Sequence, residues 1–81
     1  MKLSVLLFAA AREIACRDSV EIEIPDPASV AQARFALLQA VPALASRSES
    51  LLWAVNNEFA TDGRVLLATD MVACFPPVSG G

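Results

Sequence analysis

One segment of this sequence has the hydrophobic spacing of an amphipathic helix. It follows Pro25-Asp26-Pro27, and Ser29 and Gln32 have the spacing of a capping box with Ser29 as the N-cap residue. Its apolar stripe consists of Val30, Ala33, Leu37, Leu38 and Val41. Pro42 predicts that the helix ends near residues 40–41. Because a sheet must cover this one stripe, we expect a two-layer α+β domain.

Strand patterns lie on both sides of this helix. An apolar run at Lys2–Phe8 and an alternating segment at Ser19–Ile24 predict two strands before it. Leu51–Asn56 and Met71–Phe75 predict two strands after it. The shorter features expected are a turn or one loose helical turn at Ala9–Arg17, a loose connection at Ala43–Ser50, a turn at Asn56-Asn57, a short strand at Glu58–Ala60 and an Asp-Gly turn within Thr61–Arg64.

The first and last strands are the most apolar, so we expect them side by side at the centre of the sheet. Adjacent there, they run parallel while the helix crosses one face, which is the ubiquitin-like β-grasp arrangement. The predicted fold is an α+β β-grasp domain at residues 1–75, with a mixed sheet of four to five strands packed on one main helix. Residues 76–81 form a flexible tail. Glu21 and Glu23 alternate with apolar residues, which indicates the solvated face of an edge strand rather than an acid–base pair.

The charge and hydropathy of the chain exclude two classes of partner. The net charge is −3 and the 6 basic residues are scattered, which argues against nucleic acid. No apolar stretch approaches the ~20 residues of a membrane span. The start, Met1-Lys2 before the apolar run Val5–Ala11, resembles a secretion signal, but we interpret it as the first strand. A cytoplasmic protein is expected.

The chain is poor in residues that catalyse reactions or bind metals. It has no histidine, which removes the commonest general base and the commonest metal ligand. Cys16 and Cys74 are the only cysteines, and their context resembles neither a disulfide framework nor a CxxC metal site. Cys74 lies in an apolar run, which predicts a buried thiol. We expect no cofactor to be bound by this chain.

The chain ends in the segment FPPVSGG, Phe75–Gly81. Pro76 and Pro77 stop sheet pairing and favour a stiff extended arm. Gly80 and Gly81 have no Cβ atom and can enter a narrow slot, with Val78 and Ser79 as a bridge to the prolines. The terminal carboxylate can thereby be delivered into another protein's active site, where it can be activated as an acyl adenylate. The alternative is an ordinary frayed terminus.

Three segments carry a family resemblance. MVACFPPVSGG (residues 71–81), VLLFAAARE (residues 5–13) and LLWAVNNEF (residues 51–59) resemble segments of the small subunit of molybdopterin synthase, the MoaD family of sulfur carriers. The predicted helix falls where that family has one, so the resemblance spans nearly the whole chain. It is most specific at the tail and in the AVN segment, and it implies a β-grasp sulfur carrier.

The resemblance implies a function for the tail. An adenylating enzyme resembling ubiquitin activators would use ATP to adenylate the Gly81 carboxylate, and sulfur would then be installed to give a thiocarboxylate. Gly80 would thread the active-site channel of the large synthase subunit, which carries the catalytic residues. The thiocarboxylate would supply sulfur for the dithiolene of molybdopterin. The implied assembly is a heterotetramer of two small and two large subunits.

Partners of this family dock through an apolar patch, which gives a role to the high hydrophobic content of 56%. We expect Phe8, Phe59 and Phe75 on the sheet face opposite the helix, or at its margin, in contact with partners. Core positions are the alternative for all three. Arg12 is expected to pair with an acidic partner residue, or as a lone surface arginine to contribute little. The tail residues Pro76, Pro77, Val78, Ser79 and Gly80 complete the expected partner contacts.

The sequence departs from the family at two places. Thr69-Asp70 stands where the family usually has Gly-Asp, so the turn before the last strand is expected to differ. Trp53 replaces a smaller residue before AVN, either in the core or on a partner-facing surface.

Other functions stay open. The chain could carry sulfur for thiamine, cysteine or tRNA thiolation, although FPPV favours the molybdopterin branch. It could be a ubiquitin-like interaction module whose tail is never activated. A free-standing enzyme using Cys16 or Cys74 is the weakest alternative, because no histidine is present to activate a thiol.

Overall fold

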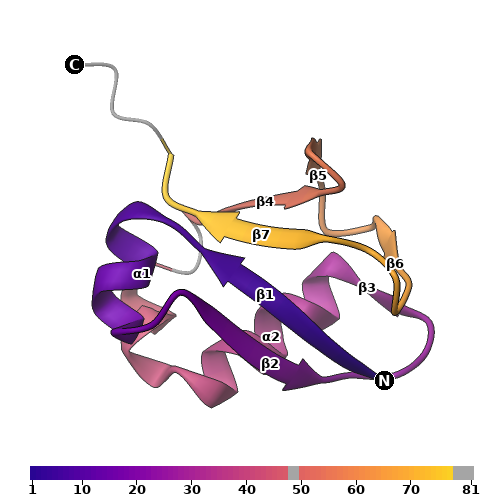
Figure 1. Ribbon diagram of the computed structural model, residues 1–81, viewed down its shortest axis with the longest axis horizontal. Helices are drawn as coiled ribbons and strands as arrows, with labels where there is room; N and C mark the ends of the chain where they lie inside the picture. Colours follow the sequence, from indigo (N-terminus) through magenta and orange to yellow (C-terminus); the bar gives the residue numbers. More distant parts are fainter. Residues whose placement is uncertain (48–49, 78–81) are drawn as a thin grey trace.

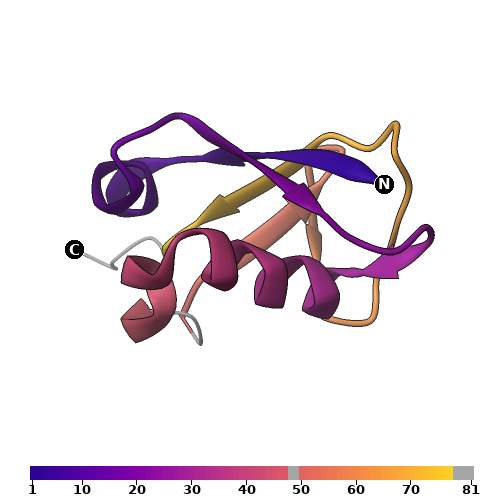
Figure 2. The same cartoon turned by 90° about the horizontal axis from the view of Figure 1, so that it is seen from below.

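The computed structural model describes residues 1–47 and 50–77 of the chain. A five-stranded mixed sheet is covered on one face by one main helix (Figures 1 and 2). The predicted two-layer β-grasp domain is therefore confirmed. The elements of these two layers are β1 (Lys2–Leu7), β2 (Ser19–Glu23), α2 (Val30–Ala40), β4 (Leu52–Val55), β5 (Glu58–Ala60) and β7 (Val72–Phe75).

The strand order is β2-β1-β7-β4-β5, so the first and last strands lie side by side at the centre (Figure 1). They run parallel, with Val5 opposite Val72 and Leu7 opposite Cys74. β2 pairs antiparallel with β1 at one edge, and β4 pairs antiparallel with β7. These arrangements confirm the predicted parallel central pair and the predicted edge position of the Glu21 and Glu23 strand.

Helix α2 begins and ends where its sequence predicts. The Gln32 backbone N–H donates to Ser29 Oγ at 3.2 Å, and the Ser29 N–H donates to Gln32 Oε1 at 2.8 Å, which completes the capping box. At the other end, the Val41 N–H donates to the Leu37 carbonyl at 2.8 Å, and a 3₁₀ helix, η1 (Pro42–Arg47), follows. The helix thus stops directly before Pro42.

The region from residue 9 to residue 17 is more helical than predicted. It forms α1 (Ala9–Ala15), which ends at Cys16 in a left-handed conformation with φ 59°. The N-cap residue, Phe8, makes no side-chain cap, so the sequence lacks the usual start signal. Ala11 is fully buried, and its packing stabilises the helix in the absence of an N-cap hydrogen bond.

A second, two-stranded sheet was not predicted. It pairs β3 (Ala28–Ser29) with β6 (Val65–Leu66), and the Val30 N–H donates to the Arg64 carbonyl beside it. The Asp-Gly turn leads into β6, with the Arg64 N–H donating to the Thr61 carbonyl at 3.0 Å. This small sheet ties the start of α2 to the segment between β5 and β7.

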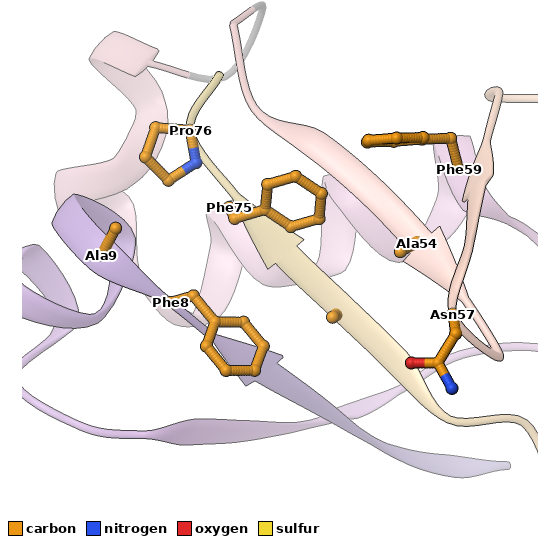
Figure 3. A pocket seen from close by; sticks show the side chains of 8 residues that line it. Phe8, Ala9, Ala54, Asn57, Phe59, Phe75 and Pro76 are labelled. Atoms are coloured by element: carbon orange, nitrogen blue, oxygen red, sulfur yellow. The ribbon is translucent and has the colours of Figure 1, made fainter. Parts of the chain in front are cut away.

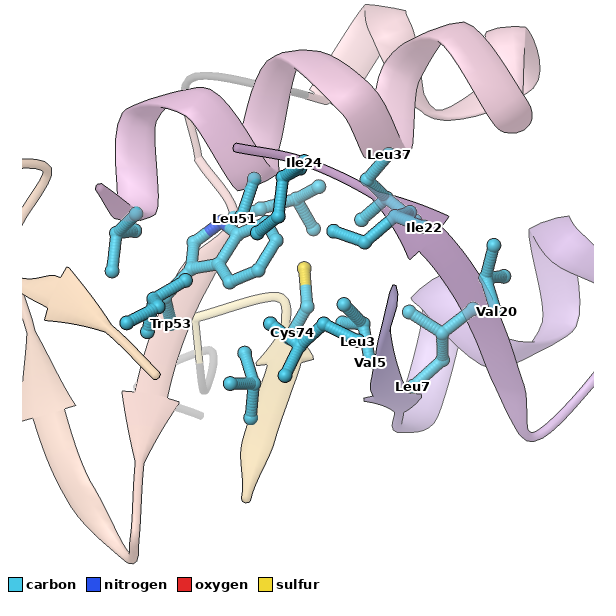
Figure 4. Close-up of a cluster of buried hydrophobic side chains, with 14 of the residues drawn as sticks. Leu3, Val5, Leu7, Val20, Ile22, Ile24, Leu37, Leu51, Trp53 and Cys74 are labelled. Carbon is cyan, nitrogen blue, oxygen red and sulfur yellow. The ribbon is translucent and has the colours of Figure 1, made fainter. Parts of the chain in front are cut away.

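The core lies between the sheet and α2 (Figure 4). Trp53 is 1% exposed and packs at the centre of this cluster, so it is a core residue. Its indole N–H has no hydrogen-bond partner among the described residues. Cys74 is also fully buried there, as predicted. The other large side chains that are fully buried in this core are Val5, Leu7, Val20, Val30, Leu37, Leu44, Val55, Leu66 and Val72.

Candidate functional site

An open apolar groove of about 470 Å³ lies on the sheet, with aromatic side chains along it (Figure 3). We call it the aromatic groove. Its floor is formed by Ala54 of β4 and Ala73 of β7, which are paired directly across the two strands. The remaining lining residues are Phe8, Ala9, Asn57, Phe59, Phe75 and Pro76.

The alternation of strand side chains explains where this groove lies. Val72 and Cys74 point into the core, so Ala73 and Phe75 point to the opposite face of β7. Trp53 likewise points into the core, which places Ala54 on the outer face of β4. The aromatic groove is therefore on the sheet face away from α2.

The three phenylalanines predicted for docking converge on this groove. Phe59 is 77% exposed and Phe8 is 48% exposed, so neither is a core residue, whereas Phe75 is partly buried. The rings of Phe59 and Phe75 have centroids 5.9 Å apart and are tilted by 53°, a favourable aromatic pair. Exposed aromatic surface of this kind is typical of a protein–protein contact. The docking role itself stays a prediction.

Arg12 lies apart from these side chains. It belongs to α1 and does not line the aromatic groove. Its Nη1 is 3.8 Å from Asp18 Oδ1, and both side chains are more than half exposed, so this pair contributes little to stability. Its pairing with a partner stays a prediction.

A polar network holds the end of the groove near Asn57. Asn56 and Asn57 form the predicted turn between β4 and β5, with left-handed φ values of 53° and 69°. The Met71 N–H donates to Asn56 Oδ1 at 2.9 Å, and the Asn56 amide donates to Asp70 Oδ1 at 3.0 Å. The Leu67 N–H donates to Asp70 Oδ2 at 2.8 Å, and together with Asn56 this lowers the pKa of the Asp70 carboxyl.

The same network explains how Thr69 replaces the family's glycine. The Asp70 N–H donates to the Leu67 carbonyl, which closes a turn around Ala68 and Thr69. Thr69 is not among the described residues with a left-handed φ, so no glycine is required there.

The tail begins beside the aromatic groove. Phe75 is the last residue of β7, and Pro76 lines the groove immediately after it. Pro77 is exposed. The predicted sites at Val78, Ser79, Gly80 and Gly81 lie outside the described residues.

The Cys74 thiol is not an activated nucleophile. Burial raises the pKa of the Cys74 thiol to about 12, so it is not a thiolate at neutral pH. Both cysteines are free. Residues 1–47 and 50–77 contain no cluster of side chains that could hold a metal ion. Within the same residues, no helix has the length and hydropathy of a membrane span.

Three groove residues were not predicted from the sequence: Ala54, Ala73 and Asn57. The available signal was the strand alternation, which places both alanines on the face of the sheet opposite to that of Trp53 and Cys74. Alanine is common in protein cores, so the presence of an alanine in a strand does not by itself predict an exposed position.

Comparisons with known proteins place this arrangement among its relatives. The family model described as the ThiS family matches residues 5–81. The chain is 35% identical to the molybdopterin synthase sulfur carrier subunit of Chlamydomonas reinhardtii, with all of both chains covered. The crystal structure of small archaeal modifier protein 1 from Haloferax volcanii is 35% identical, with a TM-score of 0.89 and all of both chains covered.

A further structure shares the fold alone. It is a complex of subunits 1 and 2 of molybdopterin-converting factor from Helicobacter pylori, at 22% identity and a TM-score of 0.69, with all of both chains covered.

Proposed function

Because this chain belongs to the ThiS family, we propose that it is the sulfur carrier subunit of a molybdopterin synthase. The relative in Chlamydomonas reinhardtii bears that name and matches along its whole length, which supports the proposal. The Gly81 carboxylate is the reactive group, and the protein acts in the cytoplasm with ATP supplied to its activating partner. This chain holds no cofactor of its own.

The proposal depends mainly on the position of Phe75 and Pro76, where the tail leaves the domain. Phe75 both ends β7 and lines the aromatic groove, and Pro76 follows it on the groove's rim. Only 4 residues follow Pro77 in the sequence. Fully extended, they reach at most about 14 Å. A partner that uses the Gly81 carboxylate must therefore bind close to Pro77, where the exposed aromatic side chains lie.

The proposed chemistry needs no catalytic group from this chain. A carboxylate oxygen of Gly81 attacks the α-phosphate of ATP on the activating enzyme, and pyrophosphate leaves. Hydrosulfide released by a sulfur donor then attacks the acyl carbon and displaces AMP, which leaves a thiocarboxylate. In the large subunit the thiocarboxylate sulfur bonds to the molybdopterin precursor, and water then hydrolyses the acyl–sulfur bond, which leaves the sulfur on the precursor and restores the Gly81 carboxylate. The raised pKa of Cys74 keeps the chain's buried thiol out of these steps.

The proposed partners are an adenylating enzyme resembling ubiquitin activators and the large synthase subunit. The complex of subunits 1 and 2 of molybdopterin-converting factor from Helicobacter pylori, one chain of which has the same fold as this protein, supports a large-subunit partner. We propose a heterotetramer of two small and two large subunits. Native mass spectrometry of the mixed subunits measures this stoichiometry directly.

A second candidate function has a specific observation in its favour. The relative from Haloferax volcanii is named a modifier protein, and its structure superposes with a TM-score of 0.89. An acyl adenylate at Gly81 could be attacked by a lysine amine of another protein instead of by sulfur, which would join the two proteins by an amide. Sulfur delivery to another pathway remains a further outcome, as does an interaction module with an unactivated tail.

Deleting Gly80 and Gly81 tests the carrier function against the interaction module. The carrier loses all sulfur transfer in a reconstituted synthase reaction, while the circular dichroism spectrum and thermal midpoint stay unchanged. The matched control, Lys2→Ala, changes an exposed side chain, keeps the tail and should retain sulfur transfer. An interaction module would instead retain partner binding and function without the two glycines.

A further inference from the structure

A second apolar groove lies between the edge strand β2 and helix α2, with a volume of about 450 Å³. We call it the edge groove. Residues 21–23 of β2 line it together with Phe35, Ala36, Gln39 and Ala40 of α2. Phe35 is 66% exposed. The edge groove shares no lining residue with the aromatic groove, and the proposed sulfur chemistry uses none of its residues.

The outer edge of β2 carries backbone groups that no described strand pairs. β2 pairs only with β1 among the described strands. Met1 and Ile24 exchange backbone hydrogen bonds in both directions, and the Leu7 N–H donates to the Asp18 carbonyl. Bonded and non-bonded pairs alternate along an antiparallel ladder. The N–H and C=O groups of Ser19, Glu21 and Glu23 therefore point outward, at the spacing that another strand requires.

The two faces of an added strand would meet different side chains. On the helix side, its side chains would enter the edge groove over Phe35 and Ala36. On the opposite face, they would lie beside the exposed carboxylates of Glu21 and Glu23. Lys2 Nζ is 3.9 Å from Glu21 Oε1, but both side chains are about two-thirds exposed, so this long pair leaves Glu21 available.

Charge decides which strand fits this edge. The chain has a net charge of −3, and a second copy would bring the same two carboxylates to the contact, so pairing of two copies is repelled. A segment with lysine or arginine at alternate positions complements Glu21 and Glu23. Apolar residues at the intervening positions bury the exposed surface of Phe35.

We propose that the outer edge of β2 and the edge groove form a docking site for an extended segment of a partner protein in which basic and apolar residues alternate. The segment adds to β2 as a sixth strand of the sheet. Its backbone bonds to Ser19, Glu21 and Glu23 give affinity, and its alternating side chains give specificity. The site is independent of the Gly81 chemistry, so a partner can bind here while the tail is engaged elsewhere.

The test uses a synthetic peptide, acetyl-KVKVKV-amide, titrated into ¹⁵N-labelled protein and followed by NMR. We expect saturable shifts in the amides of residues 19–23 and 35–40, with the amides of the aromatic groove unchanged. The amide protons of Glu21 and Glu23 should exchange more slowly with solvent when the peptide is bound. The same titration on protein lacking Gly80 and Gly81 should give the same dissociation constant, which separates this proposal from the sulfur-carrier function.

Two peptide controls separate strand addition from simple charge attraction. The peptide KKKVVV has the same composition without the alternation. A KVKVKV peptide with N-methyl groups on alternate residues keeps the charges but lacks the N–H groups that would face β2. Both should bind at least about tenfold more weakly than KVKVKV.

Three variants test the residues. Phe35→Ala should weaken peptide binding about fivefold, and Glu21→Lys combined with Glu23→Lys should weaken it about tenfold or more. Glu58→Lys changes an exposed carboxylate on the opposite edge strand, β5, and should leave binding within about twofold. All these side chains are exposed, so the fold should be retained.

Several results would overturn the proposal. These are shifts centred on Phe8 and Phe59, equal binding of the N-methylated peptide, or an equal loss from Glu58→Lys and from Glu21→Lys combined with Glu23→Lys. A dimer that forms through β2 and excludes the peptide would assign the edge to a second copy instead.

Discussion

Ala54 and Ala73 lie directly opposite each other on β4 and β7, on the sheet face away from α2. Neither side chain extends beyond Cβ, so the surface between Phe8 and Phe59 stays low and forms the floor of the aromatic groove. Phe75 lies two residues after Ala73 on the same face, and the tail follows it at once. The aromatic groove, whose floor is this pair of alanines, therefore lies directly beside the residues where the tail begins.

Filling this floor should block docking. Ala73→Glu introduces a charge and bulk between the aromatic side chains, so we expect the rate of thiocarboxylate formation at limiting activating enzyme to fall at least about tenfold. Ala31→Glu, on the exposed surface of α2, adds the same side chain away from the groove and should leave the rate unchanged. Equal rates for the two variants would show that the activating enzyme does not use the groove.

Trp53 should dominate the stability of the core. Trp53→Ala leaves a large cavity and should lower the free energy of unfolding by about 3–5 kcal/mol. Trp53→Phe should lower it by about 1 kcal/mol, because the smaller ring also removes an indole N–H that has no partner among the described residues. Urea denaturation followed by circular dichroism measures both changes. A loss in Trp53→Phe as large as in Trp53→Ala would mean that the indole N–H makes an essential bond.

Asp70 should make stability depend on acidic pH. The Leu67 N–H and the Asn56 amide lower its pKa in the folded state. A carboxyl group with a lowered folded-state pKa contributes stability above its unfolded pKa, and this contribution disappears as the pH falls through the folded-state pKa. Asp70→Asn should therefore be less stable than the wild type at pH 7, and the difference should narrow below about pH 4.

The control for Asp70→Asn is Glu23→Gln, which removes one exposed carboxylate from β2. Urea denaturation at pH 7 and pH 3 gives the comparison. A stability difference for Asp70→Asn that is the same at both pH values would contradict the role of its ionised carboxylate.

The two cysteines should differ sharply in reactivity. Cys16 is exposed, whereas Cys74 is buried and its pKa is raised to about 12. Iodoacetamide at pH 8 should therefore label only Cys16 in the folded protein and both cysteines in urea, as measured by peptide mass spectrometry. The variant Cys16→Ser should take up no label when folded. Rapid labelling of Cys74 under native conditions would contradict the packing around β7.

The sequence predicts the main elements of this fold because their signals are local. Ser29, Gln32 and Pro42 define α2 through capping and a missing N–H, and the alternation around Ile22 defines β2. The α1 helix is longer than predicted because Ala11 is buried in the hydrophobic core, among residues that lie outside its own segment. Each strand of the β3–β6 pair has only two residues, which is too short to show an alternating hydrophobic pattern. The pair also depends on backbone hydrogen bonds between segments that are far apart in the sequence.

The candidate site could be predicted in part. Phe8, Phe59 and Phe75 are large apolar residues on the predicted outer face, so their convergence follows from the fold class. The alanine floor and the Asn56–Asp70 network depend on strand register, which the sequence does not specify before the fold is known. Phe35 was not predicted to be functional because a phenylalanine within a helix usually faces the core.

The most direct test of the sulfur-carrier function is mass spectrometry of Gly81. The chain is incubated with ATP, a sulfur donor and its candidate adenylating enzyme, and intact mass and fragment ions are then recorded. We expect sulfur in place of one oxygen of the Gly81 carboxylate, with every other residue unmodified. An unmodified Gly81, in a mixture where a control carrier is converted and with a second cognate activator failing as well, would contradict it.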